Sequence, residues 1–227
     1  MRLNGLVSLK DDTDSFACTP KLVVDGGKTD LSPVTFKATK TPKLTSMSTR
    51  FASVLGNESI EFTGTGFSAS AVTTVKIDDR TCTVTAKTTT KITCKTSDKP
   101  YKPDTPRLVI NIAGFGNVAT MGKTVLYVSK WSDAQTWGND LPPQDGEAVQ
   151  VPKGQHLLYD IDKGNKLAFV NVEGSLIFPP HPSDANHHRT FDAHYIFIKN
   201  GYMEVGTEEN RYTSKITITL WSTKYDP

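Results

Sequence analysis

The chain has 227 residues, 37% of them hydrophobic and 22% charged, and its formal net charge is +2. This composition is typical of a folded soluble protein, and the length accommodates two domains of ordinary size. No group of basic residues is dense enough to follow a phosphate backbone, which argues against a nucleic-acid partner. The sequence also has no apolar stretch of the roughly 20 residues that cross a bilayer, and its first residues lack the apolar region of a secretory signal.

Residues 1–40 contain short strand-like pieces separated by Asp, Gly and Pro turns. These pieces are too few to form a domain of their own, so we expect residues 1–40 to be the last part of a preceding domain. Thr41-Pro42-Lys43 is the expected junction with the next domain.

Residues 41–129 carry short apolar stretches at regular intervals, with turn residues in every gap. The predicted strands are Ser59–Thr63, Thr74–Ile77, Cys82–Ala86, Lys91–Cys94, Arg107–Ile112 and Thr124–Val128. About seven short strands in roughly 85 residues predict a β-sandwich.

Two cysteines lie on opposite arms of a predicted hairpin in this segment. Cys82 and Cys94 flank a Lys-Thr-Thr-Thr turn, and a hairpin centred near Thr88 places them opposite each other. Opposed residues have Cα atoms about 4.5–5.5 Å apart, which a disulfide can span. We therefore predict a Cys82–Cys94 disulfide, with two reduced, buried thiols as the alternative. Zinc is a poor fit because no CxxC motif or pair of histidines lies near either thiol.

Cys18 and Asn57 both bear on the location of the chain. An unpaired cysteine in a secreted protein indicates a partner elsewhere, and the simplest place for a partner of Cys18 is upstream of residue 1. Asn57-Glu58-Ser59 is a glycosylation sequon in a turn-like stretch. Both features predict an extracellular chain whose true N-terminus precedes Met1, and a cytosolic chain is the alternative.

A glycine-containing corner carries a family resemblance. The residues are Ile60-Glu61-Phe62-Thr63-Gly64-Thr65-Gly66-Phe67-Ser68, followed by Val75-Lys76-Ile77, Cys82 and Ile92-Thr93-Cys94-Lys95-Thr96. On these residues the segment resembles an immunoglobulin-like IPT/TIG domain, which implies a β-sandwich over residues 41–129. Gly-Thr-Gly is then a tight corner in which glycines take positive φ and Phe67 fills the core, because the helix that a dinucleotide-binding loop requires is not signalled. Phe16-Ala17-Cys18-Thr19-Pro20 resembles the second-cysteine strand of a preceding TIG domain.

After Lys130, Gly and Pro turns separate strongly apolar stretches. The predicted strands are Ala148–Val151, His156–Ile161, Leu167–Val172, Ser175–Phe178, Tyr195–Lys199, Tyr202–Val205 and Lys215–Leu220. The dipeptide Asn200-Gly201 is typical of a hairpin or a tight corner.

Residues 130–227 resemble the G8 (eight-glycine) domain. The resemblance rests on Trp131 and Trp137, on Leu141-Pro142-Pro143, and on residues 146–155, 172–178 and 203–209. Seven glycines lie in this segment, so one glycine of the family pattern is replaced or displaced. A TIG domain followed by a G8 domain resembles the arrangement in fibrocystin-like cell-surface proteins, which implies an all-β architecture that leads into a β-helix beyond the chain.

The histidines are weak candidates for a metal site. His181, His187 and His188 lie close together in sequence with aspartates, and such a set can hold a divalent metal. The polar, proline-containing stretch around them favours a solvated loop instead. Glu173 and Glu204 could be considered as a glycosidase pair, but nothing in the sequence sets their separation. No Ser-His-Asp or Cys-His arrangement is recognisable, so we predict no catalytic residue and no cofactor.

Several aromatic residues could stack on sugar rings or anchor a protein partner. They are Trp131, Trp137, Tyr159, Tyr195, Tyr202, Tyr212 and Trp221. Trp131 and Trp137 are expected to fix the start of the G8 segment onto its core. Tyr202, Tyr212 and the neighbouring Arg211 are expected to point outward and to contact a ligand or partner.

Together these features predict a non-catalytic binding, adhesion and structural region of a large protein on the surface of a cell, cilium or flagellum. The expected partners are other copies or neighbouring domains of a large extracellular chain, and glycans or matrix. Two alternatives stay open. The chain could be an accessory domain of an enzyme that processes a hyaluronan-like glycan, with the catalytic part downstream, or a subunit of an extracellular filament that assembles through exposed strand edges.

Overall fold

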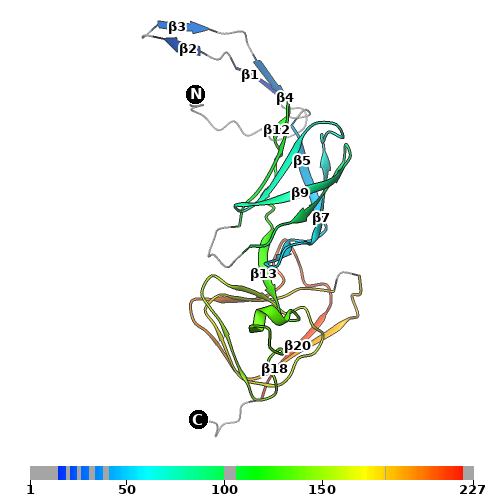
Figure 1. The fold of residues 1–227 in the computed structure, drawn as a ribbon, viewed down its shortest axis with the longest axis vertical. Helices are drawn as coiled ribbons and strands as arrows, with labels where there is room; N and C mark the ends of the chain where they lie inside the picture. Colours follow the sequence, from blue (N-terminus) through cyan, green and yellow to red (C-terminus); the bar gives the residue numbers. More distant parts are fainter. Residues whose placement is uncertain are drawn as a thin grey trace. The chain divides into compact units, whose positions relative to one another are not determined.

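The computed structural model describes the backbone of four strands between residues 15 and 37, and it describes residues 41–99, 106–181 and 183–221 in full. Regular secondary structure in these residues is β, apart from one 3₁₀ helix at Ala134–Trp137 (Figure 1). The predicted all-β class is confirmed. The chain divides into two compact units. Unit 1 comprises Met1–Arg50, Ser59–Lys95 and Arg107–Thr124, and unit 2 comprises Phe51–Glu58, Thr96–Pro106 and Val125–Pro227.

The four N-terminal strands form two antiparallel pairs. β1 (Ser15–Cys18) pairs with β4 (Val34–Lys37), and β2 (Lys21–Val24) pairs with β3 (Gly27–Asp30). The backbone of Cys18 lies opposite that of Val34. The Cys18 side chain is outside the described residues, so its pairing stays a prediction. The domain bounds 1–40, 41–129 and 130–227 also stay predictions.

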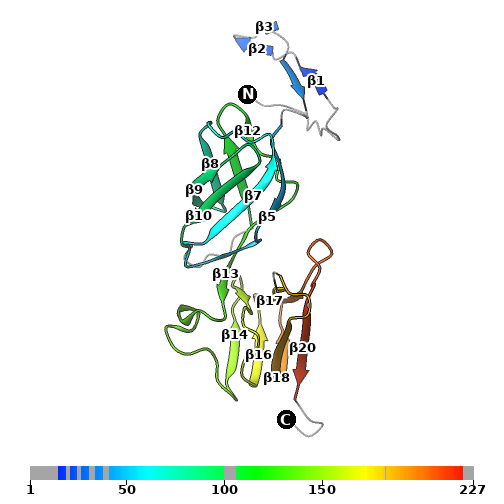
Figure 2. The same cartoon turned by 90° about the vertical axis from the view of Figure 1, so that its right-hand side faces the viewer.

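Unit 1 is built around a seven-stranded sheet in the order β12-β11-β8-β9-β10-β7-β5 (Figure 2). Its strands are β5 (Lys43–Met47), β7 (Ser59–Thr65), β8 (Thr73–Ile77), β9 (Arg80–Lys87), β10 (Lys91–Thr96), β11 (Leu108–Ile112) and β12 (Gly116–Asn117). The two edges of the sheet meet where Lys43 forms a bridge with Ala119 and the Leu44 N–H donates to the Ala119 carbonyl at 2.9 Å. The sheet therefore rolls around a core of alternating apolar side chains such as Ile60 and Phe62, both fully buried.

The Gly-Thr-Gly corner follows the prediction in part. Gly66 has a φ of +73°, a conformation that favours glycine. Gly64 is needed for a different reason, because a Cβ there would lie 2.1 Å from the Lys43 carbonyl oxygen and 2.4 Å from the Phe67 ring. Phe67 is buried, as expected.

Unit 2 consists of two sheets in which the paired strands are parallel. The first has the order β19-β17-β15-β13-β6 and the second the order β14-β16-β18-β20. The first sheet contains β6 (Phe51–Ser53), β13 (Leu126–Lys130), β15 (His156–Leu158), β17 (Ser175–Phe178) and β19 (Tyr202–Val205). The second contains β14 (Ala148–Val151), β16 (Leu167–Val172), β18 (His188–Ile198) and β20 (Lys215–Leu220). From β15 to β20 successive strands alternate between the sheets, so the chain winds as a coil.

The Asn200-Gly201 dipeptide is a tight corner of this coil, and the hairpin alternative is wrong. β18 pairs with β16 and β20, whereas β19 pairs with β17 in the other sheet. A Cβ at Gly201 would lie 2.4 Å from the Gly174 carbonyl oxygen, and one at Gly174 would lie 2.2 Å from the Gln155 carbonyl oxygen. The corners of successive turns are thus stacked backbone on backbone, which leaves no room for a side chain.

Aromatic rings fill the space between the two sheets of unit 2. Tyr159 lies 5.0 Å from Trp131 and from Phe191 and 5.3 Å from Phe178, measured between ring centroids. Edge-on and tilted packing of this kind suits the quadrupoles of the rings. Trp137 packs edge-on against Trp131 and donates its indole N–H to the Trp131 carbonyl at 2.8 Å. The expectation that Trp131 and Trp137 fix the start of this segment onto the core is confirmed.

Candidate functional site

The structure joins Cys82 and Cys94 in a disulfide. The two residues lie on the neighbouring strands β9 and β10, with their Cα atoms 5.5 Å apart. Both are buried, at 1% and 0% exposure, so the bond staples the core of unit 1 and is not available for exchange chemistry at the surface. Disulfides of this kind persist in oxidising compartments outside the cytosol.

Asn57 lies on the surface in the turn between β6 and β7. Its side chain is exposed, and its φ of +61° follows Gly56 at +70°. The next side chain, Glu58, is half-buried and accepts the Ser53 backbone N–H at 2.6 Å. The acceptor residue of the sequon is therefore exposed, and glycosylation of Asn57 stays a prediction.

His181 and His187 come together, but one nitrogen of each ring is engaged with a different partner. The two rings stack with centroids 4.4 Å apart. His181 Nδ1 accepts the backbone N–H of Asp184 at 3.0 Å, and His187 Nε2 contacts Asp162 Oδ1 at 2.8 Å. Because each of these nitrogens already has a partner, the histidine pair has a structural role and stabilises the loop before β18.

The other polar candidates do not contact this histidine pair in any described interaction. His188 points away on β18 and contacts Thr217 Oγ1 at 2.8 Å, while Glu173 pairs with Lys199 at 3.6 Å. Glu204 lies on β19, opposite Ile177 of β17. Among the described residues, no group of three or more His, Cys, Asp or Glu side chains is arranged to hold a metal ion.

The expected outward orientation holds for Tyr202 and is wrong for Tyr212, and contact of Tyr202 or Arg211 with a ligand or partner stays a prediction. Tyr202 is 47% exposed on β19, and Arg211 is exposed. Tyr212 does not point outward, because its ring packs against the core of unit 2 and its hydroxyl is buried. The backbone of Tyr212 also approaches Gly206 closely, since a Cβ at Gly206 would lie 2.5 Å from the Tyr212 nitrogen.

A larger group of exposed aromatic residues lies on the second sheet of unit 2. Phe169 is 39% exposed, Tyr195 36%, Phe197 52% and Trp221 48%. Tyr195 and Trp221 were among the aromatic residues noted in the sequence, whereas Phe169 and Phe197 lie within apolar stretches that read as fully buried strands. Their exposure follows from the pairing register between β16 and β18, which cannot be read from the sequence.

Two family models together match most of the chain from residue 42 onward. The IPT/TIG domain matches residues 42–127, and the G8 domain matches residues 136–227. Human fibrocystin-L is 28% identical over 192 residues, and mouse fibrocystin-L is 29% identical over 188 residues. Those matches cover 84% and 82% of this chain, but each covers 4% of the relative. Dog fibrocystin is 27% identical over 66% of this chain and 4% of its own length.

Among solved structures, the full extracellular region of plexin A4 matches 39% of this chain and 8% of its own, with a TM-score of 0.35 and 17% identity. No helix in the described part of the chain is long and apolar enough to cross a membrane. On the two domain matches and the sheets that carry them, this chain holds an IPT/TIG domain followed by a G8 domain, and over most of its length it is distantly similar to fibrocystin-L and fibrocystin.

Proposed function

We propose that this chain is a non-catalytic binding and adhesion region of a large receptor-like protein exposed on a cell surface. The observation that carries the proposal is a TIG domain followed directly by a G8 domain. The match to human fibrocystin-L covers 84% of this chain but only 4% of fibrocystin-L. In such a protein this region is one module among many. The buried Cys82–Cys94 disulfide supports an extracellular setting, because such bonds are rare in the cytosol.

The polar residues support binding over catalysis. The nitrogens and carboxylates that could serve chemistry are engaged in local contacts, such as His187 with Asp162 and Glu173 with Lys199. The exposed aromatic side chains of the second sheet are instead suited to recognition, since large amphipathic or apolar rings supply contact area at small entropic cost.

A cell-binding assay tests this proposal. The intact chain, produced with its disulfide formed and labelled with a fluorophore, is incubated with intact ciliated epithelial cells. We expect saturable binding that excess unlabelled chain displaces, and that is lost when the cell surface is treated with protease and glycosidases together. Binding that never saturates, or no binding above that of an unrelated β-sandwich protein, would contradict the proposal.

A further inference from the structure

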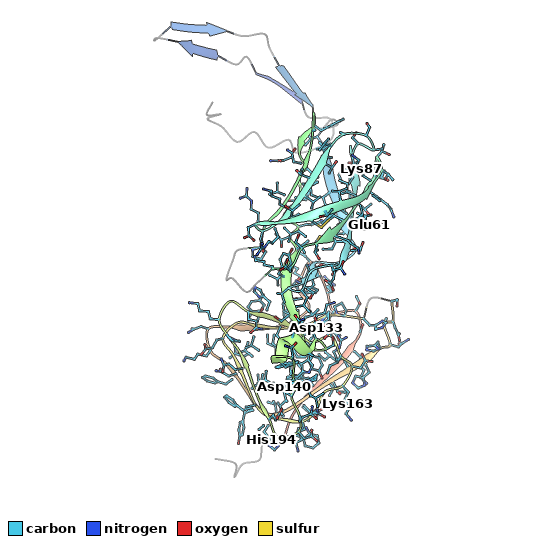
Figure 3. All side chains as sticks on the ribbon, viewed as in Figure 1. Glu61, Lys87, Asp133, Asp140, Lys163 and His194 are labelled. Carbon is cyan, nitrogen blue, oxygen red and sulfur yellow. A yellow bond between two sulfur atoms is a disulfide. The ribbon has the colours of Figure 1, made fainter. Side chains whose placement is uncertain are left out.

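The outer face of the second sheet of unit 2 carries an ordered array of rings and amides. In the registers of β14, β16 and β18, Ala148 lies beside Phe169 and Phe169 beside Tyr195, while Gln150 lies beside Asn171 and Asn171 beside Phe197. The alternating residues of β14 and β16 are buried valines, which fixes this set on the outside. Figure 3 labels His194, the residue before Tyr195 on β18.

Trp221 extends this array at the end of β20. Its backbone N–H donates to the Ala193 carbonyl at 2.9 Å, and its indole N–H donates to Asp192 Oδ1 at 2.9 Å. The Lys166 ammonium lies 4.4 Å from its ring centroid. Because Asp192 is partly exposed between the buried Phe191 and Ala193, these contacts hold the indole on the outer side of the sheet. We call Gln150, Phe169, Asn171, Tyr195, Phe197 and Trp221 the ring-and-amide face.

The charges around this face are already engaged. Lys166 lies over the Trp221 ring and Asp192 accepts the indole N–H, while Lys199 is paired with Glu173. The six residues of the face are themselves neutral. The amide of Asn171 donates to Gln150 Oε1 at 2.7 Å, so the two side chains support each other in a fixed orientation. The face thus offers rings and amides to a ligand, and the charges named beside it are of opposite sign, Lys166 with Asp192 around Trp221 and Lys199 with Glu173.

The dimensions of the face favour a small ligand. Neighbouring strands lie about 4.8 Å apart and alternate residues about 6.7 Å apart, so four strands, with Trp221 at the end of β20, and two rows span on the order of 14 Å by 7 Å. A stable protein interface buries roughly 800 Å² on each partner, far more than this area. An anionic ligand would need free basic side chains. A neutral ligand with apolar C–H faces and hydrogen-bonding edges fits both the size and the charge.

We propose that the ring-and-amide face binds a neutral glycan. Pyranose rings stack on Phe169, Tyr195, Phe197 and Trp221, and the exposed amide of Gln150, which Asn171 holds in place, hydrogen-bonds to hydroxyl or acetamido groups at the ring edge. This inference rests on the proposed binding function and names the ligand class of the G8 segment.

Titration calorimetry with defined sugars tests the inference. The intact chain is titrated with cellohexaose and chitohexaose, which are neutral, and with a heparin hexasaccharide, which is anionic. We expect at least one neutral sugar to bind and the anionic one not to. Phe197→Ala and Trp221→Ala should each weaken that binding about three- to tenfold, as loss of one aromatic contact does.

Phe115→Ala is the matched control, because Phe115 is also 52% exposed but lies in the β11–β12 turn of unit 1. It should leave the affinity unchanged, and thermal unfolding should show that all three variants are folded. Equal weakening by Phe115→Ala, binding of the heparin hexasaccharide alone, or no binding of either neutral sugar would overturn the inference.

The cell assay keeps the two proposals distinguishable. If cells still bind the Phe197→Ala, Trp221→Ala double variant as they bind the wild type, the glycan face is wrong and the binding function stands. If cells bind neither protein, the binding function is wrong as well.

Discussion

The ammonium of Lys130 is paired with the carboxylate of Glu58, 72 residues earlier in the chain. Lys130 ends β13, the strand that pairs on one side with β6 and on the other with β15. β6 and the first two residues of β13 lie in the range matched by the TIG domain, and β15 lies in the range matched by the G8 domain. One parallel sheet of unit 2 therefore contains strands from both matched ranges, and the Lys130–Glu58 pair lies within this unit.

The Lys130–Glu58 pair should make the chain sensitive to alkali. Burial alone lowers the pKa of Lys130, but the hydrogen bond and charge of Glu58, with the charges of Asp160 and Asp133, raise that pKa above its ordinary 10.5. A pKa that is higher in the folded state contributes stability below the unfolded value and loses it as pH rises past that value. The free energy of unfolding should therefore fall above about pH 10.5.

Urea unfolding at neutral and alkaline pH measures this effect. Lys130→Met should cost about 1 kcal/mol at neutral pH, as a partly exposed pair does, and should flatten the alkaline decline. Lys91→Met is the control, because its pair with Glu61 is exposed at 52% and 40%. An alkaline decline that is identical in wild type and Lys130→Met would show that the pair does not contribute.

Phe191→Ala should destabilise unit 2 strongly. The ring is 1% exposed and contacts Trp131, Tyr159 and Phe178, so its removal leaves a cavity among three other rings. Such truncations cost about 3–5 kcal/mol. Phe169→Ala, on the exposed outer face, should cost less than about 1 kcal/mol. Denaturant unfolding of the two variants side by side decides the matter, and similar losses would mean that the ring cluster is not the core.

Gly201→Ala should disrupt the stacked corners of the coil. The added Cβ would meet the Gly174 and Val172 carbonyl oxygens at 2.4 and 2.6 Å, and both are backbone atoms that cannot turn away. We expect a loss at the upper end of the range for overpacking, about 3 kcal/mol. Gly146→Ala is the comparison, because nothing lies within 4 Å of its added Cβ and only its φ of +81° opposes the change. A smaller loss for Gly201→Ala than for Gly146→Ala would refute the stacked-corner account.

Asn57 should carry an N-linked glycan when the chain is made in a secretory pathway. The side chain is exposed, and Asn57-Glu58-Ser59 is an acceptor sequence. Treatment with an amidase that removes N-linked glycans should lower the mass by one glycan and convert Asn57 to Asp. Asn57→Gln should abolish the shift without loss of folding, whereas an unshifted wild-type mass would show that the site is not used.

The fold could be predicted from the sequence where side-chain pattern and turn chemistry agree. The corner at Gly64 and Gly66 places Phe67 in the core as predicted, and Cys82 lies beside Cys94 on neighbouring strands. The predicted strands began at Ser59 and so omitted β5 and β6. β6 has only three residues, which is too short for a period-2 pattern to stand out.

The ring-and-amide face could not be predicted from the sequence to the same extent. The stretches around Phe169 and Phe197 are apolar at nearly every position, so alternation cannot tell the outer side from the inner one. Only the parallel register, Phe169 beside Tyr195 and Asn171 beside Phe197, shows which side chains gather on one face. Tyr212 was misjudged for a related reason: its charged neighbours indicate a surface loop, and the packing of its ring against the core of unit 2 is a tertiary contact.

The most direct test of the account is non-reducing peptide mapping of the natural full-length protein. We expect a peptide pair joined through Cys82 and Cys94, and Cys18 linked to a peptide outside these 227 residues. That result would establish an extracellular chain built from disulfide-bonded domains. Free thiols at all three cysteines would contradict it, because a reduced chain is what the cytosol would produce.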